Sequence, residues 1–85
     1  MKLIICAVKD AALDAFMRPM FVAAKGQAVR AFTDEVNKAD SELNKHPTDY
    51  SLYYLGTYDD GDASFVSEGR PTLLIRAIDC LQSSN

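Results

Sequence analysis

The sequence predicts a small α+β domain: an antiparallel sheet of about four strands with one main helix packed on one face and a short C-terminal helix. Three stretches carry this prediction: an apolar run near the start of the chain, a helix with a single apolar stripe, and an aromatic run that ends in a tight turn. With 85 residues, the chain has room for a single domain, residues 1–85, and for a correspondingly small core.

The apolar run, residues 3–8, consists of β-prone side chains and stops at Lys9. Such a run is typical of a central strand with both faces covered. Residues 10–15 are too few for a helix before Pro19, so they predict a turn or a long hairpin connection. Residues 16–22 are predicted to be extended. Because Pro19 has no amide hydrogen to donate, this segment is expected to be an edge strand or a strapped loop.

The helix is predicted over residues 25–38. Val29, Phe32 and Val36 recur at spacings of three and four, with Ala28 on the same side, while the charged residues fall mostly elsewhere. One apolar stripe on a polar helix predicts packing against one face of a sheet, with Phe32 as the central anchor. Residues 40–46 lack this periodicity and contain several turn formers, so they predict a polar loop.

The aromatic run follows Pro47. Residues 50–58 are rich in tyrosine, leucine and threonine and predict a strand. The Asp-Asp-Gly sequence at residues 59–61 predicts a tight hairpin turn, and residues 62–68 predict the return strand.

Alternation along this strand separates its tyrosines. Tyr53 is expected on one face, together with Leu55, and the other three tyrosines on the opposite face with Leu52. These three are Tyr50, Tyr54 and Tyr58. Both faces carry apolar area, so the strand is either sandwiched inside the fold or offers aromatic rings to a partner.

The C-terminal part has two interpretations. Residues 67–70 predict a loop, and Pro71 suits the first turn of a helix, where a missing amide hydrogen costs nothing. Leu74, Ile78 and Leu81 follow at helical spacing, which predicts a short C-terminal helix. A fifth strand over residues 72–78 is the alternative, because their leucine and β-branched content also suits a strand.

The two cysteines, Cys6 and Cys80, lie near opposite ends of the chain among apolar residues, with no cysteine or histidine at metal spacing. Buried free thiols are therefore favoured over a disulfide, which indicates a reducing, cytoplasmic setting. The N-terminal apolar run has no plausible cleavage site after it, and no stretch approaches the roughly 20 apolar residues of a membrane span. We expect a soluble, unexported protein without membrane contact.

No motif of a catalytic, metal or cofactor site is complete. His46 is the only histidine and stands in a loop before a proline, so a structural or capping role is favoured over catalysis or metal binding. Asp59, Asp60 and Asp62 resemble the opening of a calcium loop, but the remaining ligands and the terminal glutamate are missing. The glycines are too scattered to cradle a phosphate. We therefore expect no enzymatic activity, no metal and no cofactor.

Binding of single-stranded nucleic acid needs aromatic faces on which bases stack and cations that follow the backbone. The tyrosines and Phe65 can supply the rings, and basic residues from Lys2 and Lys9 onward can supply the cations. The candidate nucleic-acid-binding residues are Arg18, Lys25, Arg30, Lys45, Tyr50 and Tyr53. The competing interpretation is that half or more of the rings fill the small core, because strands favour aromatic residues and the rings bury large areas.

The formal net charge of −3 is unevenly distributed. Residues 1–30 hold five basic and two acidic residues, whereas the remainder holds four basic and ten acidic residues. This asymmetry is compatible with a basic face on an acidic protein. The acidic total argues against tight binding to duplex DNA, because that affinity comes mostly from phosphate neutralisation.

Three segments stand in a distinctive order before the acidic turn: Met-Arg-Pro-Met-Phe at residues 17–21, Ala-Val-Arg-Ala-Phe at residues 28–32, and above all Lys-His-Pro-Thr-Asp-Tyr-Ser-Leu at residues 45–52. In this order they resemble the small nonstructural protein of gokushovirus-type microviruses, which are icosahedral phages with single-stranded circular DNA genomes. The resemblance runs over most of the chain. It implies a phage-encoded, DNA-binding protein of the host bacterial cytoplasm, absent from the capsid and associated with viral DNA replication or packaging. It carries over no catalytic residue.

The leading hypothesis is therefore a non-enzymatic accessory protein that binds single-stranded DNA in phage genome replication or packaging. The alternative is an adaptor that binds a viral or host replication or packaging protein through a sheet edge or a tyrosine face. A homodimer or higher homo-oligomer is also expected, because the core is small and residues 17–21 place apolar side chains at an edge. Basic residues around exposed tyrosines favour DNA, whereas an apolar patch rimmed by mixed charge favours a protein partner.

Overall fold

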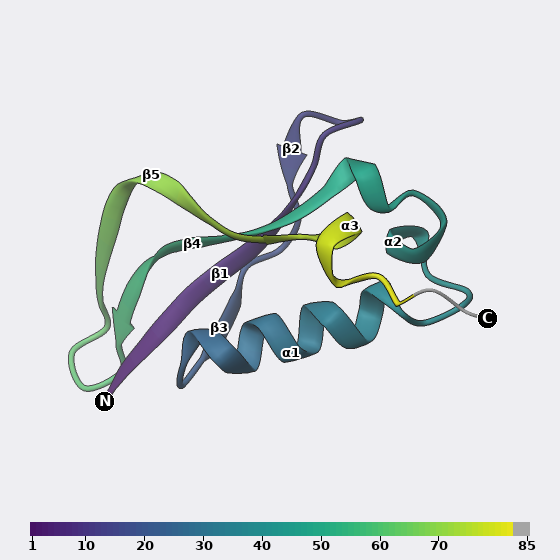
Figure 1. Ribbon diagram of the computed structural model, residues 1–85. Helices are drawn as coiled ribbons and strands as arrows, with labels where there is room; N and C mark the ends of the chain where they lie inside the picture. Colours follow the sequence, from purple (N-terminus) through teal and green to yellow (C-terminus); the bar gives the residue numbers. More distant parts are fainter. Residues whose placement is uncertain (83–85) are drawn as a thin grey trace.

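The computed structural model of the chain describes residues 1–82 and shows one curled antiparallel sheet with the longest helix lying across one of its faces (Figure 1). The strands are β1 (Lys2–Asp10), β2 (Ala15–Phe16), β3 (Met20–Val22), β4 (Tyr50–Asp59) and β5 (Ser64–Arg76). The helices are α1 (Lys25–Val36), α2 (Glu42–Lys45) and α3 (Ala77–Cys80), and a 3₁₀ turn covers Pro47–Asp49. The predicted α+β class is confirmed.

β1 is the central strand, as its apolar run predicts. β4 pairs antiparallel with it along its whole length, and β2 and β3 pair with its other edge. The two short strands are separated by residues 17–19: β2 pairs with Lys9 and Asp10, and β3 pairs with Ile4–Cys6. The predicted edge strand is therefore confirmed, although it is divided in two and not extended over all of residues 16–22. β5 forms the opposite edge of the sheet, beside β4.

The core lies between the sheet and α1. Ala28, Phe32 and Val36 of α1 are buried against the sheet, and Phe32 is only 2% exposed. The rest of the buried cluster consists of Cys6, Val8, Leu43, Leu52 and Ala77. The helical stripe therefore packs as predicted, although α1 ends at Val36 rather than at residue 38.

The helix is closed at both ends by its own polar side chains. At the N-terminus, the Gln27 side chain folds back and accepts hydrogen bonds from the backbone N–H groups of Ala23 and Ala24 at 2.7 and 3.3 Å. At the C-terminus, the Asn37 side chain donates to the carbonyl of Cys80 at 3.0 Å and accepts from the amide of Gln82 at 2.7 Å. Asn37 thus ties residues 80–82 to the end of α1.

The prediction of an irregular polar loop at residues 40–46 is wrong over α2. Ser41 is the N-cap of this single turn: its hydroxyl accepts from the amide of Asn44 at 3.1 Å and donates to the carbonyl of Glu35 at 2.7 Å. Leu43 is buried in the core. One capping serine and one buried leucine are enough to form a turn of helix that is too short to show periodicity.

The predicted loop at residues 67–70 and the helix from Pro71 are also wrong, and the alternative strand is observed up to Arg76. β5 pairs with β4 from Ser64 to Arg76, although residues 68–71 arch away from it opposite Leu55, as Figure 1 shows. Pro71 is tolerated because β5 is an edge strand. The short C-terminal helix is present but begins only at Ala77.

Both cysteines are free thiols, Cys6 buried and Cys80 half-buried. Burial raises the pKa of the Cys6 thiol. In the part of the chain that the structure describes, no helix is long and apolar enough to cross a membrane.

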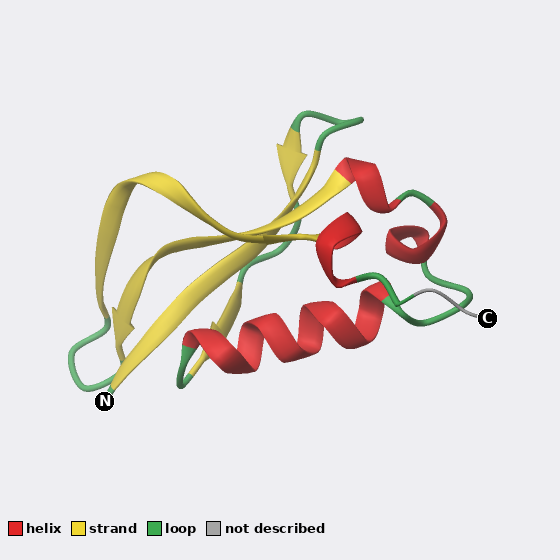
Figure 2. Cartoon of the chain, viewed as in Figure 1, coloured by secondary structure: helices red, strands yellow, loops and turns green. Residues whose placement is uncertain are grey.

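Figure 2 shows that the helices gather toward one end of the sheet, whereas the β4–β5 hairpin at the other end extends past the start of α1. The molecule is elongated, with extents of 48 × 24 × 18 Å. The helical end holds the core, and the hairpin end is covered by neither α1 nor the short helices.

We expect Phe32→Ala to lower the free energy of unfolding by about 3 to 5 kcal/mol, because it leaves a cavity where the main helix meets the sheet. Urea denaturation followed by circular dichroism measures the effect. The control is Arg30→Ala, an exposed position on the same helix, for which a change within about 0.5 kcal/mol is expected. A Phe32→Ala protein as stable as the parent would contradict the packing described above.

Candidate functional site

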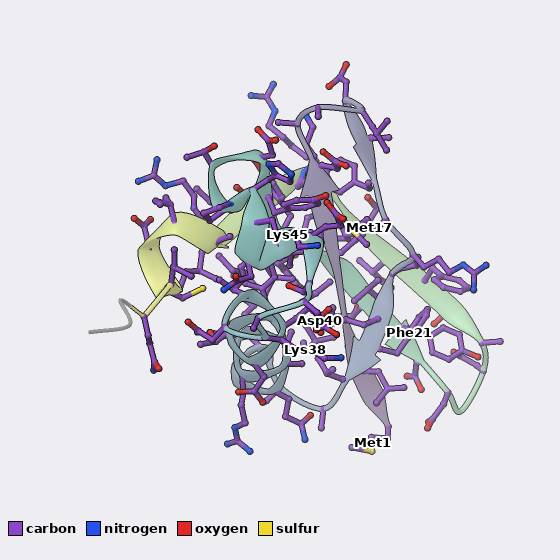
Figure 3. All side chains as sticks on the ribbon, turned by 90° about the vertical axis from the view of Figure 1, so that its right-hand side faces the viewer. Met1, Met17, Phe21, Lys38, Asp40 and Lys45 are labelled. Carbon is purple, nitrogen blue, oxygen red and sulfur yellow. The ribbon has the colours of Figure 1, made fainter. Side chains whose placement is uncertain are left out.

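The candidate site is the face of the sheet that α1 does not cover, called the open face below. Ile4, Cys6 and Val8 of β1 and Met20 and Val22 of β3 belong to the core or pack against it. Their neighbours along each strand therefore point the other way. Figure 3 looks at the molecule from the helical end and shows Phe21 on the side of the sheet away from α1. The side chains of the open face used below are Ile5, Lys9, Phe16, Phe21, Tyr53, Leu55, Tyr58 and Phe65.

A bulge in β4 determines which tyrosines reach this face. Ile5 pairs with Gly56 and Cys6 with Tyr54, so Leu55 has no partner on β1. The extra residue inverts the alternation beyond this point. Tyr58 therefore lies opposite Leu3, on the same face as Tyr53. The prediction that Tyr58 shares a face with Tyr50 and Tyr54 is wrong, whereas Tyr50 and Tyr54 do pack against the core with Leu52.

Gly56 makes this bulge possible. Its φ of +152° lies in a region that L side chains rarely adopt, and a Cβ at this position would overlap the carbonyl oxygen of Val66 on β5. Glycine is therefore required where β4 changes its alternation.

The first aromatic group of the open face, called the Tyr53 cluster, consists of Lys9, Phe16 and Tyr53. The rings of Phe16 and Tyr53 meet edge to face with centroids 5.5 Å apart, and the Lys9 Nζ lies 5.7 Å from the Phe16 centroid. Lys9 also forms an ion pair of 3.5 Å with Asp14. A small hollow of about 150 Å³ lies beside it, lined by Lys9, Ala11, Thr48, Asp49, Ser51 and Tyr53.

The second group, called the hairpin cluster, consists of Phe21, Tyr58 and Phe65. Tyr58 meets Phe21 edge to face at 5.6 Å and lies tilted against Phe65 at 4.8 Å. An open apolar hollow of about 250 Å³ adjoins it, lined by Ile5, Pro19, Phe21, Leu55, Phe65, Val66 and Ser67. No charged side chain of residues 1–82 is among its lining.

The six predicted nucleic-acid-binding residues do not form one group. Tyr53 is on the open face, and Arg18 is exposed in the β2–β3 connection next to Pro19. Lys25 lies on the α1 side, with its Nζ 4.2 Å from the ring centroid of Tyr54. Arg30 is exposed on α1, and Lys45 is exposed at the end of α2.

Tyr50 is the remaining predicted residue, and it is half-buried against the core. Burial first, and then the nearby carboxylate of Asp10, raise the pKa of its hydroxyl. Burial and a hydrogen bond with Glu68 likewise raise the pKa of Tyr54. Two of the four tyrosines are therefore engaged on the core side.

Phe16 and Phe21 belong to the site but were not among the predicted residues. The signal for Phe21 is its place between Met20 and Val22, because a strand whose alternate residues face the core presents the residue between them to the other side. Phe16 lies opposite Lys9 in the β1–β2 pair, a register that cannot be read from the sequence.

The negative charge at the hairpin end is concentrated in the β4–β5 turn. The N-terminal ammonium group lies 2.8 Å from a carboxylate oxygen of Asp60 and 3.6 Å from one of Asp59. A hydrogen bond from the Gly61 amide lowers the pKa of Asp59, and hydrogen bonds from Ser64 lower that of Asp62. Within residues 1–82, no group of three or more histidine, cysteine or acidic residues could hold a metal ion.

These features define a small α+β protein whose single sheet is covered on one face and exposes aromatic rings on the other. A model of the family described as Phage ORF5 protein matches residues 3–80, so the chain belongs to this family. The expected phage origin is therefore confirmed. Comparisons with curated proteins and with solved structures gave no significant match.

We expect Gly56→Ala to lower the free energy of unfolding by about 2 to 5 kcal/mol, because backbone strain adds to the overlap with Val66. The matched control is Gly26→Ala in the first turn of α1, where an added Cβ meets nothing within 4 Å. The Gly26→Ala control should raise the free energy of unfolding by up to about 1 kcal/mol. Thermal melts measure both, since each kcal/mol shifts the Tm of a domain of this size by about 4 to 8 °C. Equal Tm values for the two variants would contradict the conclusion that the β4 bulge requires glycine at position 56.

Proposed function

We propose that this phage protein is a non-enzymatic accessory protein that binds single-stranded DNA on its open face and acts in replication or packaging of a microvirus genome in the bacterial cytoplasm. The observation that carries the proposal is the Tyr53 cluster, where two aromatic rings and a cation lie together on an uncovered sheet surface. Bases stack on such rings regardless of sequence, and each stacked base contributes about 1 to 3 kcal/mol.

The geometry of the Tyr53 cluster suits a base better than a duplex. Phe16 is 42% exposed and Tyr53 is half-buried, so the rings are anchored in the sheet but accessible. The hollow beside them is lined in part by Thr48, Asp49 and Ser51, whose polar atoms can pair with the edge of an unstacked base. A base in a duplex presents neither its faces nor its pairing edge.

Lys9 and Arg18 are the phosphate contacts of this proposal. Asp14, which pairs with Lys9, has a side chain that is 91% exposed, so this surface ion pair opens at little cost when a phosphate approaches. Two contacts give a slope of log affinity against log salt of about −1.4 for a single strand. Lys25, Arg30 and Lys45 lie on the α1 side or at the helical end, and the DNA path proposed here does not use them.

The resemblance of residues 17–21, 28–32 and 45–52 to the nonstructural protein of gokushovirus-type microviruses supports the genome assignment. A phage whose genome is single-stranded exposes long unpaired DNA during replication and packaging. A small protein with a stacking surface and few cations suits such DNA, because its binding is weak and reversible.

A second candidate function is favoured by a different part of the open face. The hollow of the hairpin cluster is apolar and has no charged lining within the described residues, which suits a protein surface and not a nucleic acid. This observation supports the adaptor hypothesis at the hairpin end and is compatible with DNA binding at the Tyr53 cluster.

The test is fluorescence anisotropy of a labelled oligothymidine, titrated with each variant across a salt series. Tyr53→Ala should weaken binding by about 1 to 3 kcal/mol and leave the salt slope nearly intact, because stacking releases few counterions. Tyr53→Phe keeps the ring and should bind like the parent. Lys9→Ala should flatten the slope by up to ~0.7, the value of one lost phosphate contact.

Arg30→Ala is the control for charge, because it removes one cation from the opposite side of the molecule. Its slope should match that of the parent. If the parent does not bind the oligonucleotide at low salt, the DNA proposal is wrong and the adaptor hypothesis is favoured. A flattened slope for Arg30→Ala with an unchanged slope for Lys9→Ala would place the DNA on the α1 side instead.

A further inference from the structure

We propose that a second copy of this chain covers the hairpin end of the open face, in a two-fold homodimer in which the Phe65 ring of each protomer enters the apolar hollow of its partner. The proposal concerns the surface formed by the hairpin cluster and its hollow. It does not depend on DNA binding, because the Tyr53 cluster belongs to a separate part of the open face.

The first argument is the area that the single chain leaves uncovered. Its accessible surface is 5604 Å², whereas a compact monomer of this mass exposes about 5000 Å². The radius of gyration, 13.5 Å, likewise exceeds the roughly 12 Å of a compact domain of this length. The excess of roughly 600 Å² approaches the ~800 Å² that each partner buries in a standard interface.

The second argument is the chemical character of the uncovered surface. Phe21 is 45% exposed and Phe65 is 66% exposed. The exposed parts of the two phenylalanines together amount to about one whole side chain, on the order of 200 Å² of apolar surface. Because the residues that line the hollow are apolar except Ser67 and none of them is charged, a charged ligand finds no ion-pair partner there.

The third argument is self-complementarity, which favours a second copy over another protein. The same surface carries a hollow and, as part of its lining, the Phe65 side chain, which packs against Tyr58 and is 66% exposed. A two-fold contact needs both features on one patch, because each protomer must present what the other receives. Here one patch holds both.

The charge of the β4–β5 turn determines the orientation of the two copies. Asp59, Asp60 and Asp62 lie at the tip of the hairpin. Parallel hairpins would place two acidic tips side by side, whereas antiparallel hairpins point them in opposite directions. The dimer is therefore antiparallel, with its axis passing near the hairpin cluster.

The edge at Pro19 is part of the same surface. The sequence predicts an oligomer contact around residues 17–21, and in the structure Pro19 and Phe21 line the hollow while Met20 packs against the core. The proposal therefore keeps this edge but centres the contact on Phe21 and Phe65.

The test is the molar mass of the parent and its variants in micromolar solution, measured by light scattering after size-exclusion chromatography. The parent should show twice the 9.4 kDa mass of the chain. Phe65→Asp places a carboxylate in the hollow and should weaken the dimer by about 30-fold or more, the effect of losing an interface hot spot. Phe21→Asp, at the other exposed ring of this surface, is a second variant with the same expected direction.

Leu13→Asp is the matched control, because Leu13 is 75% exposed in the β1–β2 turn and lies outside the surface. It should remain a dimer. Thermal melts establish that each variant is folded before its mass is interpreted. Folded Phe65→Asp and Phe21→Asp proteins that stay dimeric would overturn the proposed surface.

A parent that stays monomeric throughout the micromolar range would overturn the dimer and leave the hollow to a protein of another sequence. The DNA titration separates the two proposals, because Phe65→Asp should keep the salt slope of the parent while Tyr53→Ala should keep its dimeric mass.

Discussion

The structure depends on a mismatch between the area of the sheet and the length of the helix that covers it. The sheet is apolar on both faces, and among the described residues only α1 is longer than one helical turn. α1 has 12 residues and spans roughly 18 Å, whereas β4 has 10 residues and spans roughly 33 Å. The helix can therefore cover one face and only part of the length of that face. The open face and the projecting hairpin are consequences of this difference in length.

The chain compensates for its small core in two ways. Polar side chains of the segment after α1 bind backbone carbonyls, as when the Asn44 side chain donates to Val36 at 3.0 Å, so that short elements hold their place without much apolar burial. On the open face, the rings pack edge to face against one another, which hides part of each ring from water. Neither kind of contact removes all of the exposed apolar surface. In the two proposals above, a base or a second protomer covers the apolar surface that remains on the open face.

The sequence predicts those elements whose signal is local. β1, the stripe of α1 and the first half of the hairpin depend on composition and periodicity within one segment, and they are observed. The face of Tyr58 depends on a bulge, and the extent of β5 depends on the free edge of β4 beyond it, so both are decided by pairing between distant segments. Gly56 inside a strand was the available sign of the bulge. For the site, Tyr53 could be assigned to a face, but the basic residues could not, because the side of the sheet that α1 covers appears only in the fold.

The distribution of carboxylates bears on the proposal that an acidic protein binds DNA on its open face. The open-face pairing positions of β1 are Leu3, Ile5, Ala7 and Lys9, of which Ile5 and Ala7 are buried, and those of β4 are Ser51, Tyr53 and Tyr58. Most carboxylates lie elsewhere, on α1, around α2 and in the β4–β5 turn, at positions such as Asp34, Glu42 and Asp60. Under the DNA-binding proposal, a strand at the Tyr53 cluster would meet Lys9 at short range, but also the carboxylates of Asp14 and Asp49. Repulsion from the more distant acidic residues would be screened by salt. The proposal of stacking on Phe16 and Tyr53 therefore depends on the local balance of Lys9 and Arg18 against Asp14 and Asp49, and not on the net charge of −3.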